Sequence, residues 1–362
     1  MKKFAFLIHP RDTSDVARRF PIAKFLPDRG VNTIIERLRG RFGFTICSRF
    51  EPFEKVEGYI IAVLLTGEQM VSSPRKLVHQ RILETILFAQ DKLEVELIGL
   101  GALTASVTNA GRWIIRQPKV RVSITHGDTY ATTVAEEGIE KIVTLCGFIP
   151  SQVKIAIVGA YGLIGSALTK LLSQKGYQLI LAGRNKVKLE NLRQELKDLG
   201  TENNIYTLID LEEISDADIV VTATSHPGTL IRPEHLKHGA VVYDIAQPMN
   251  VFPDLIKERP DVIKIDGAYV DINGIKLGFD MGPPPKTTFA CLAETIMMAL
   301  EGNNNHCVGE IDLLRVEETR RWAEKYRFSH APFSCFSKPV PQERFCKISE
   351  LKQNKVFSTM KT

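Results

Sequence analysis

Apolar and polar positions along the chain alternate in blocks that predict strands and helices in turn. Short runs without polar alternation, such as residues 153–158, are typical of strands buried on both faces of a sheet. Longer segments with an apolar side chain every three or four residues predict helices with one buried face. We expect strands at residues 4–8, 60–65, 95–98, 120–125, 153–158, 178–182, 205–209, 218–223, 241–245 and 262–265. We expect helices at residues 74–90, 129–146, 164–174, 185–199, 288–301 and 311–326.

This pattern divides the chain into four parts, and the expected fold class is α/β. Residues 1–150 mix strands with helices, which predicts an N-terminal α/β domain with a connecting helix. Residues 151–282 repeat strand, helix and strand, which predicts a parallel sheet covered on both faces. Residues 283–330 are expected to form C-terminal helices, and the polar, proline-containing residues 331–362 a flexible tail.

Composition narrows the class of protein. The chain has 362 residues, of which 44% are hydrophobic and 25% charged, the ordinary mix of a soluble globular protein. The net charge of +5, from 47 basic and 42 acidic side chains, is far below that of a dedicated nucleic-acid binder. The longest uncharged stretch, residues 97–111, is too short and too polar to span a bilayer, although a transient membrane contact stays open.

The six cysteines favour a reducing compartment. None forms a C-x-x-C pair, and no Cys/His cluster has the spacing of metal ligands, so we expect no metal and no disulfide framework. The apolar run at the amino terminus ends at Ile8, which predicts a first strand rather than a signal peptide. The expectation is therefore a cytoplasmic protein with free thiols.

A glycine motif follows the strand predicted at 153–158 and precedes the helix predicted at 164–174. Its spacing, G-x-x-G-x-x-G, is a variant of the dinucleotide fingerprint, in which glycines allow a tight turn and a close approach of backbone amides to a pyrophosphate. This context predicts a Rossmann-type sheet that binds a dinucleotide. The alternative is a glycine-rich turn that binds none. The expected cofactor-binding residues of the motif are Gly159, Ala160, Tyr161, Gly162, Leu163, Ile164 and Gly165.

The end of the next predicted strand indicates which dinucleotide binds. NAD-specific sites place Asp or Glu there, whereas this chain has Arg184, followed by two lysines. Because a guanidinium pairs well with phosphate, we expect Arg184 to contact the 2′-phosphate of NADPH. The alternative is that Arg184 and the two lysines are solvated residues at the start of a helix and contact no cofactor. The strand predicted at 218–223 should end beside the nicotinamide ribose. The further residues expected to bind the cofactor are Arg184, Asn185, Ala223 and Thr224.

Cys291 is the candidate nucleophile. If Thr287 or Thr288 caps the helix predicted at 288–301, Cys291 lies in its first turn. There the helix dipole, helped by Lys286, would lower the pKa of the thiol and favour the thiolate. A thiolate can accept an acyl group from a thioester, and the acyl-enzyme can accept hydride. The alternative is a small buried cysteine, which is how we interpret the other five.

Four segments together resemble the long-chain acyl-[acyl-carrier-protein] reductase family, whose members form fatty aldehydes. The resemblance runs from about residue 98 to residue 302, and the segment at 289–294 is its most specific part. The nucleotide-binding part is also similar to shikimate dehydrogenases and glutamyl-tRNA reductases, notably at 216–224. The four matching segments are 99–104 (GLGALT), 125–129 (THGDT), 159–165 (GAYGLIG) and 289–294 (FACLAE).

The resemblance implies a two-stage reaction with NADPH. In the family the cysteine of the last segment carries the acyl group, which places the acyl-enzyme on Cys291, and hydride transfer then releases the aldehyde. The first 150 residues would form the substrate domain. His126 is a candidate proton donor, and Gly101 and Thr104 are candidates for substrate contact. An oxyanion donor is also needed, for which amides at the start of the Cys291 helix and the loops at 99–104 and 125–129 are candidates.

The implied acyl donor is acyl carrier protein or acyl-CoA, and a downstream enzyme that uses the aldehyde is an expected partner. Acyl carrier protein is acidic, so a basic docking surface is expected. Two basic-rich stretches qualify, although a solvated mixed surface explains either equally well. They are Arg11, Arg18, Arg19, Lys24, Arg29, Arg37, Arg39 and Arg41, and Arg112, Arg116, Lys119 and Arg121.

Two other functions are open at this point. The first is an NADP-dependent dehydrogenase of a small polar hydroxy- or amino-acid, with Cys291 merely buried. The second is a protein that senses NADP and does not turn over a substrate. An alanine at Cys291 would leave activity intact in the first case, and NADPH would bind without being consumed in the second.

Overall fold

The computed structural model describes residues 1–12, 15–16, 25, 27, 30–31, 33, 43–201, 204–226 and 228–359, with only the backbone from 352 on. The chain forms two compact units. The first contains residues 1–131 and 270–329, and the second contains residues 132–269 and 330–362. The α/β fold class is confirmed. The units differ from the four expected parts, because the C-terminal helices belong to the first unit and the helix expected to connect two domains is shared by both. The chain passes between the units in α6 (Asp128–Leu145), β12 (Tyr269–Asp271) and β14 (Ser329–His330).

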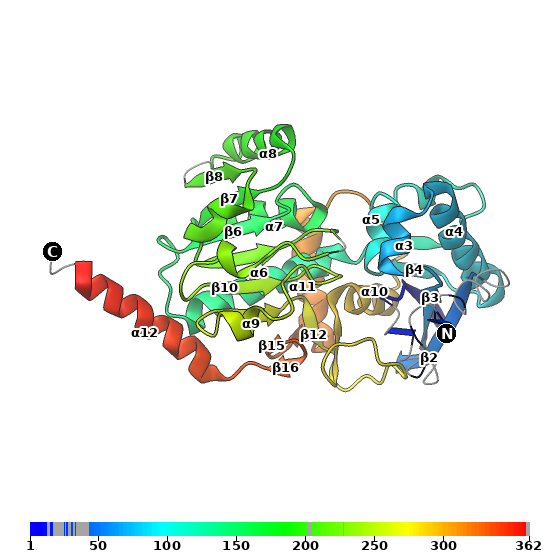
Figure 1. The fold of residues 1–362 in the computed structure, drawn as a ribbon. Coiled ribbons are helices and arrows are strands. Elements are labelled where there is room, and N and C mark those ends of the chain that lie inside the picture. Colours follow the sequence, from blue (N-terminus) through cyan, green and yellow to red (C-terminus); the bar gives the residue numbers. More distant parts are fainter. Residues whose placement is uncertain are drawn as a thin grey trace. The chain divides into compact units, whose positions relative to one another are not determined.

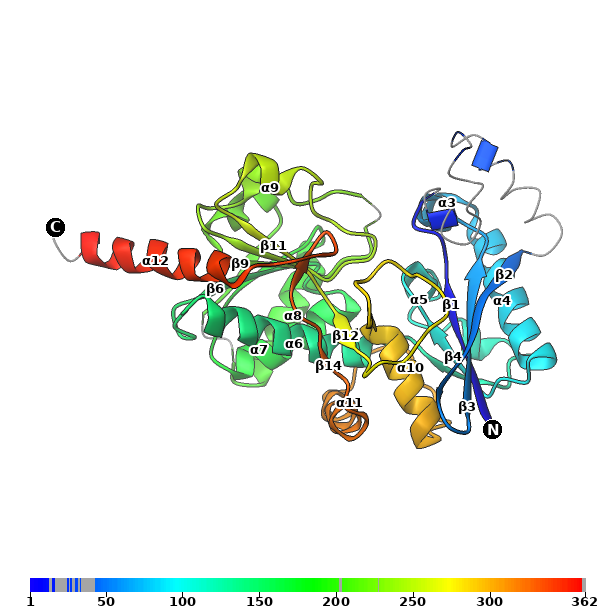
Figure 2. The same cartoon turned by 90° about the horizontal axis from the view of Figure 1, so that it is seen from below.

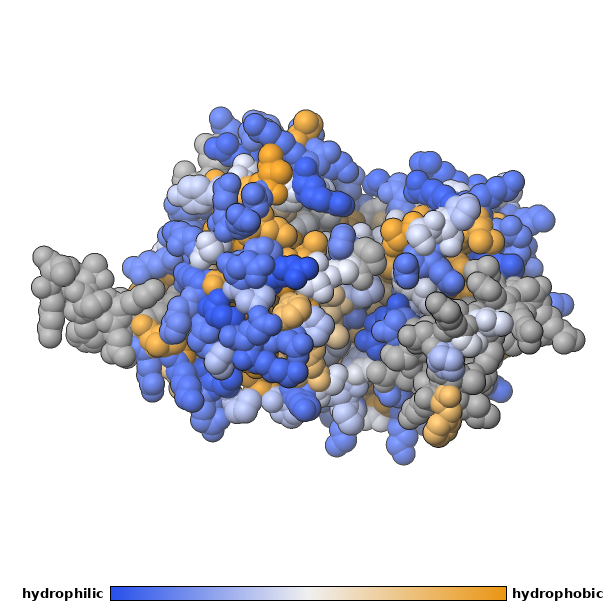
Figure 3. Space-filling model, viewed as in Figure 1, coloured by the Kyte–Doolittle hydropathy of each residue, from blue (hydrophilic) through white to orange (hydrophobic). Residues whose placement is uncertain are grey.

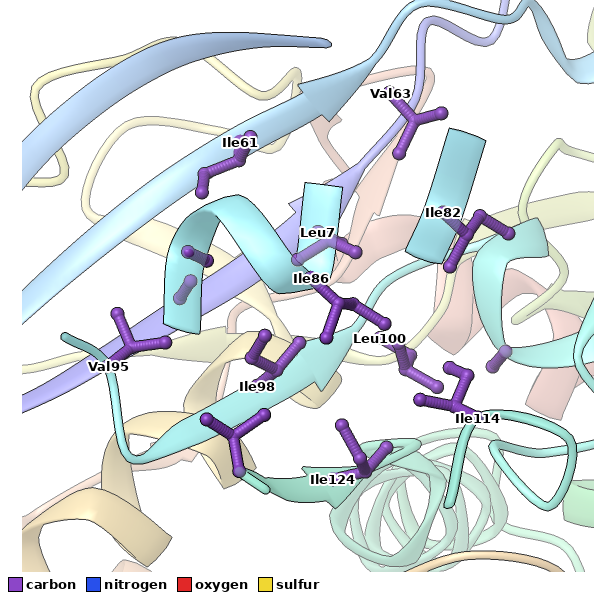
Figure 4. Packing of buried hydrophobic residues seen from close by; sticks show 14 of the residues in the cluster. Leu7, Ile61, Val63, Ile82, Ile86, Val95, Ile98, Leu100, Ile114 and Ile124 are labelled. Atoms are coloured by element: carbon purple, nitrogen blue, oxygen red, sulfur yellow. The ribbon is translucent and has the colours of Figure 1, made fainter. Parts of the chain in front are cut away.

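The first unit is built on a five-stranded sheet with the order β2-β3-β1-β4-β5. Strand β2 pairs antiparallel with β3, and the other pairs are parallel. Apolar side chains of the sheet and of α4 interdigitate in one buried cluster (Figure 4). Helix α10 covers part of this sheet and packs against β1 and β4 (Figure 2). The elements of this unit are β1 (Lys2–Ile8), β2 (Phe44–Phe53), β3 (Val56–Val63), α3 (Gly67–Ser72), α4 (Arg75–Lys92), β4 (Leu97–Leu100), α5 (Leu103–Val107), η2 (Ile114–Arg116), β5 (Ser123–Thr125), β13 (Thr287–Phe289), α10 (Ala290–Glu301) and α11 (Leu313–Tyr326).

The second unit is built on a six-stranded sheet with the order β11-β10-β9-β6-β7-β8, in which every pair is parallel (Figure 1). This is the doubly wound order, and its strand order reverses between β6 and β9. The expected parallel sheet is confirmed. The elements are β6 (Lys154–Val158), α7 (Leu163–Gln174), β7 (Gln178–Ala182), α8 (Lys186–Asp198), β8 (Ile205–Leu208), η3 (Leu211–Asp216), β9 (Ile219–Thr222), η4 (Pro233–His235), β10 (Val241–Asp244), α9 (Leu255–Glu258), β11 (Ile263–Asp266), β15 (Ser334–Cys335), β16 (Lys338–Pro339) and α12 (Gln342–Thr359).

The segment expected to be a flexible tail is folded in the part that the structure describes. Asp266, at the end of β11, accepts hydrogen bonds from the Ser334 hydroxyl at 2.8 Å and from the amides of Phe336 and Ser337 at 3.0 and 2.8 Å. The same carboxylate pairs with the fully buried ammonium of Lys264. A buried, charge-assisted anchor of this kind fixes the hairpin β15–β16 to the sheet, and composition alone does not reveal it.

The surface is mainly polar. Hydrophilic side chains cover most of the face in Figure 3, and apolar side chains gather there only in small groups. Among the described residues, no helix combines the length and the hydropathy that a membrane span needs.

Candidate functional site

Cys291 lies in the first turn of α10, as expected from the sequence. The cap differs from the expected one: Thr287 and Thr288 belong to β13, and Phe289 precedes the helix without a side-chain hydrogen bond to it. Because β13 pairs with β12, the two threonines that the sequence analysis proposed as helix caps lie in a strand instead. The residue as a whole is half-buried.

Gly127, in the turn that leads into α6, lies directly against Cys291. A Cβ added at Gly127 would lie 2.6 Å from the Cα of Cys291 and closer still to its Cβ. The glycine also has a φ of +72°, which side-chain-bearing residues rarely adopt. The first turns of α6 and α10 therefore meet at the cysteine, as near as two backbones can approach.

The thiol is not activated in the expected way. Burial and the negative charge of Asp128 raise the pKa of Cys291 to about 12. The amides of Leu292 and of Cys291 itself favour the thiolate, as the helix-dipole argument predicts, but they offset only part of this rise. The expectation of a lowered pKa is wrong, because desolvation outweighs the helix amino terminus.

Asp128 is the titratable group that the sequence analysis missed. It is the first residue of α6 and follows the glycine that touches Cys291. Burial raises the pKa of Asp128 to about 6, the charge of His126 lowers it, and the charge of Glu294 raises it further. A carboxyl group with a pKa close to neutrality can both accept and donate a proton under physiological conditions.

Glu294 joins α10 to the start of α6. Its side chain is 1% exposed, and both carboxylate oxygens accept hydrogen bonds, Oε1 from the Thr125 hydroxyl at 2.6 Å and Oε2 from the Tyr130 amide at 2.8 Å. The Thr125 hydroxyl in turn accepts a hydrogen bond from the Gly127 amide at 3.1 Å. A glutamate on an otherwise apolar helix face is a signal in the sequence that could have revealed this group.

His126, the candidate proton donor, is fully buried beside a different cysteine. Its Nδ1 accepts the Asp128 amide at 2.9 Å, so the proton of a neutral ring lies on Nε2. Nε2 is 4.0 Å from the sulfur of Cys307, which also lies 3.4 Å from the Thr129 hydroxyl. The geometry therefore directs His126 toward Cys307. The interpretation of Cys307 as one of five unremarkable cysteines left out this cluster.

His126, Glu294 and Cys307 could in principle hold a metal ion, since one ligand atom of each lies within 4.8 Å of the others. The hydrogen bonds do not suit such an ion. A metal at Nε2 requires a proton on Nδ1, yet Nδ1 accepts a backbone amide, and both oxygens of Glu294 are engaged. That no metal takes part stays a prediction.

Gly101 and Thr104, the candidates for substrate contact, make contacts that hold their own loop in place. The Thr104 hydroxyl is fully buried and donates to the Gly101 carbonyl at 2.7 Å. A Cβ at Gly101 would lie 2.7 Å from the carbonyl oxygen of Leu7, so this glycine lets the loop pass close to β1. Both residues shape the loop after β4, and their polar groups are used within it.

The glycine motif forms the turn between β6 and α7, at the point where the strand order reverses. Gly159 has a φ of +88°, and a Cβ there would lie 2.6 Å from the Ala223 carbonyl oxygen. Gly162 precedes α7 without a side-chain cap, which leaves the amides of the first helical turn open to a phosphate. Ala223 and Thr224 thus lie beside the motif, and the cradle fits a dinucleotide. That these two residues contact the cofactor stays a prediction. The other motif residues, Ala160, Tyr161, Leu163, Ile164 and Gly165, complete this turn and the start of α7.

Exposed cations surround the end of β7. Arg184 is exposed, as are the two lysines in the first turn of α8. The Asn185 side chain caps α8 by accepting the Lys188 amide at 3.0 Å, and the Asn185 amide donates to the Tyr161 hydroxyl at 3.2 Å. These exposed cations suit the 2′-phosphate of NADP. That Arg184 and Asn185 touch the cofactor stays a prediction.

Asn250 is a further residue that the sequence analysis missed. Fully buried, it accepts from the Thr224 hydroxyl at 2.7 Å and donates to the carbonyls of His226 and Gly228 at 2.8 and 3.0 Å. The backbone amide of Asn250 donates to the buried carboxylate of Asp244 at 3.1 Å. Asn250 therefore shapes the loop after β9, which borders the glycine motif.

The basic stretches give no docking surface that the structure can confirm. In the first, Arg11 pairs with Asp15, and the seven other cations lie outside the described residues. In the second, Arg112 and Arg121 form exposed ion pairs with acidic side chains, and Arg116 and Lys119 are exposed.

Comparisons with known proteins agree with the nucleotide-binding fold. Residues 148–269 match the family described as shikimate / quinate 5-dehydrogenase. The aminotransferase PigE of Serratia sp. (strain ATCC 39006) is 27% identical over 310 residues, and the match covers 83% of this chain and 36% of that protein. A long-chain acyl-[acyl-carrier-protein] reductase of Synechococcus elongatus is 28% identical over 261 residues, and the match covers 68% of this chain and 74% of that protein.

Among solved structures, quinate dehydrogenase from Corynebacterium glutamicum aligns with a TM-score of 0.38 and 14% identity, over 72% of this chain and 87% of that one. The chain spans little more than a third of the length of the Serratia relative. From the glycine motif and the family match, residues 148–269 form a shikimate dehydrogenase-like, NADP-binding domain of the kind found in NADP-dependent oxidoreductases.

Proposed function

We propose that the chain is an NADPH-dependent reductase that converts a fatty acyl thioester to a fatty aldehyde through an acyl group on Cys291. The observation that carries this proposal is the position of Cys291, a half-buried residue in the first turn of α10, against the glycine turn that leads into α6. The likeness to the Synechococcus reductase supports it, because that match covers 68% of the chain. The match to a shikimate dehydrogenase of Legionella pneumophila covers 30%.

The first step needs a base, because a thiol with a pKa of about 12 is almost wholly protonated at neutral pH. Asp128 serves as that base. The Cys291 proton passes to its carboxylate as the sulfur bonds to the thioester carbonyl carbon. The carbon–sulfur bond to the donor then breaks, and the donor leaves as a thiol with the proton that Asp128 returns.

The second step reduces the acyl-enzyme. NADPH held at the glycine motif would supply the hydride, and with it two electrons, to the carbonyl carbon of the acyl group, where a C–H bond forms. Amides in the first turn of α10 stabilise the negative charge on the acyl oxygen. The bond between the carbon and the Cys291 sulfur then breaks, the aldehyde leaves, and the sulfur regains a proton from solvent through Asp128. The donor is acyl carrier protein or acyl-CoA, and a partner enzyme that consumes the aldehyde completes the proposal.

The test is intact-protein mass spectrometry with aldehyde detection. Wild type, Cys291→Ala and Cys307→Ala are each given long-chain acyl-carrier protein or acyl-CoA, with and without NADPH. We expect an acyl adduct on wild type and on Cys307→Ala, released as aldehyde when NADPH is added, and no adduct on Cys291→Ala. An adduct that persists on Cys291→Ala contradicts the assignment of the nucleophile.

A second candidate function is a dehydrogenase of a small polar hydroxy- or amino-acid, which the family match of residues 148–269 favours. It predicts oxidation or reduction of a polar substrate at equal rates in wild type and Cys291→Ala. If no donor acylates the protein and no polar substrate turns over while NADPH binds, the chain is a sensor of NADP rather than an enzyme.

A further inference from the structure

Glu294 poses a question that packing alone does not answer. It is a carboxylate with 1% exposure in the middle of a helix whose other buried side chains, apart from Thr295, are apolar. Burying a charge is costly unless hydrogen bonds replace the lost water. Both of its oxygens have such bonds, and both donors lie in the segment that leads into α6.

Those hydrogen bonds form a chain that ends at Gly127, the residue packed against the nucleophile. Glu294 binds the Thr125 hydroxyl at the end of β5 and the Tyr130 amide in the first turn of α6. The Thr125 hydroxyl also accepts the Gly127 amide. The two bonds of Glu294 thus hold the turn at Thr125 and at Tyr130, and between these residues lie Gly127, which lies against Cys291, and Asp128 directly after it.

We propose that Glu294 is a positioning residue: through Thr125 and Tyr130 it holds the turn at 125–130 against Cys291, so that Asp128 stands ready to exchange the thiol proton. The inference rests on the proposed function for the chemistry at Cys291. The hydrogen-bonded arrangement itself does not depend on that function, and it can be tested separately.

The decisive comparison is between two variants of Thr125. Thr125→Val keeps the shape of the fully buried side chain and removes the hydroxyl, so Glu294 and the Gly127 amide each lose a partner. Thr125→Ser keeps the hydroxyl and removes the methyl group. If the side chain only fills space, valine is the better substitute. If the hydrogen bonds position the turn, serine is the better one.

The first readout is the rate of Cys291 acylation in single turnover, with thermal unfolding and NADPH affinity measured alongside. We expect Thr125→Val to lower the rate at saturating donor by about 10- to 100-fold, because small displacements of reacting groups are costly. We expect Thr125→Ser to stay within about threefold of wild type, with NADPH affinity unchanged in both. A valine variant that acylates as fast as the serine variant overturns the proposal.

The second readout needs no acyl donor. Full-length protein is treated with iodoacetamide across a range of pH, and modification of Cys291 is followed by peptide mass. The charged groups that act on the thiol are Asp128 and Glu294. Glu294→Gln removes one of these charges, so it should shift the midpoint of modification to lower pH through charge alone. The matched control, Glu301→Gln, changes a glutamate at the far end of α10, bonded to Lys325 and Tyr326, and should shift nothing. Thr125→Val leaves every charge in place and should shift the midpoint only because the turn that carries Asp128 moves away from the thiol. Thr125→Ser should leave the midpoint at the wild-type value.

The two readouts separate the two hypotheses. If wild type takes no acyl group from any donor, the proposed function fails, while the iodoacetamide midpoints of Thr125→Val and Thr125→Ser, which change no charge, still test the positioning. If wild type is acylated but Glu294→Gln and Thr125→Val leave both the midpoint and the rate at wild-type values, the positioning role is overturned. Should Thr125→Val not fold, the acylation rate of Glu294→Gln decides: a rate equal to that of Glu301→Gln overturns the proposal, because the amide at 294 can accept only one of the two hydrogen bonds.

Discussion

The nucleotide-binding turn depends on backbone groups, whereas the thiol site depends on side chains. The turn at 159–165 uses backbone: glycines that bring amides close to a phosphate, all within one short segment. The thiol site uses side chains from three segments far apart in the sequence, around Thr125, Cys291 and Cys307. A site of the first kind leaves a local pattern that sequence reasoning can find. A site of the second kind depends on pairs that only folding brings together.

The largest effect we predict is at Gly127, where the thiol site also depends on backbone. Gly127→Ala combines a clash with the Cys291 backbone and an unfavourable φ, and should lower the free energy of unfolding by about 4 kcal/mol. The control in the same unit is Gly274→Ala, which has a φ of +81° but open space around it, and should cost about 1 kcal/mol. Denaturant unfolding measures both, and equal losses would mean that the contact with Cys291 is not tight.

The second prediction concerns the nucleotide-binding turn. Gly159→Ala places a methyl group against the Ala223 carbonyl and should weaken NADPH binding by about 100-fold, roughly 2.7 kcal/mol. Gly200→Ala, at a φ of +71° with nothing nearby, should leave NADPH affinity unchanged. Calorimetric titration compares the two. Wild-type affinity in Gly159→Ala would remove the turn from the nucleotide site.

The third prediction separates stability from catalysis at Asp128. Its pKa is raised from 3.8 to about 6 in the folded state, so the folded chain holds the proton more tightly. Stability from this group is therefore full below pH 3.8, is lost as pH rises to about 6, and does not return above it. Asp128→Asn should raise stability at pH 8 by about 2 kcal/mol while slowing Cys291 acylation.

Unfolding curves at pH 8 and pH 4 check this third prediction, because the advantage of Asp128→Asn should disappear at the lower pH. An advantage that is the same at both pH values would show that the side chain acts through packing. An acylation rate equal to that of wild type would remove Asp128 from the proton transfer.

The smallest effect we predict is at Arg184. Arg184→Ala should weaken NADPH binding by about tenfold and leave NADH binding unchanged, because only the former carries the 2′-phosphate. Arg193→Ala, in α8, the helix that follows Arg184, lies near Glu190, serves as the control and should change neither. An equal loss for both nucleotides would mean that Arg184 contacts another part of the cofactor.

Sequence reasoning recovered the elements whose signal is local. The strands at 154–158 and 178–182 and the helix at 163–174 lie within one or two residues of their predicted bounds, because each is a short apolar run bounded by glycine. Sequence reasoning missed β2, an antiparallel edge strand. Its side chains alternate between buried and exposed only in the second half of the strand. It also missed β13, because the threonines at 287 and 288 read equally well as helix caps.

For the candidate site, the position of Cys291 in its helix could be predicted from the sequence, but the groups that surround the thiol could not. Helix periodicity places the cysteine in a first turn, which the structure confirms. The pKa of its thiol depends on burial and on Asp128, a residue far away in the sequence, and neither follows from the motif. The same applies to His126, whose ring orientation is set by the Asp128 amide and directs it toward Cys307.

The division of the first unit into two chain segments has a consequence for biosynthesis. Residues 1–131 leave the ribosome long before α10, which packs against β1 and β4. Until α10 is made, the face of the sheet that it covers stays exposed in the nascent chain, while residues 132–269 of the second unit are already complete. Exposed apolar surface of this kind is a target for chaperones and a risk for aggregation during synthesis.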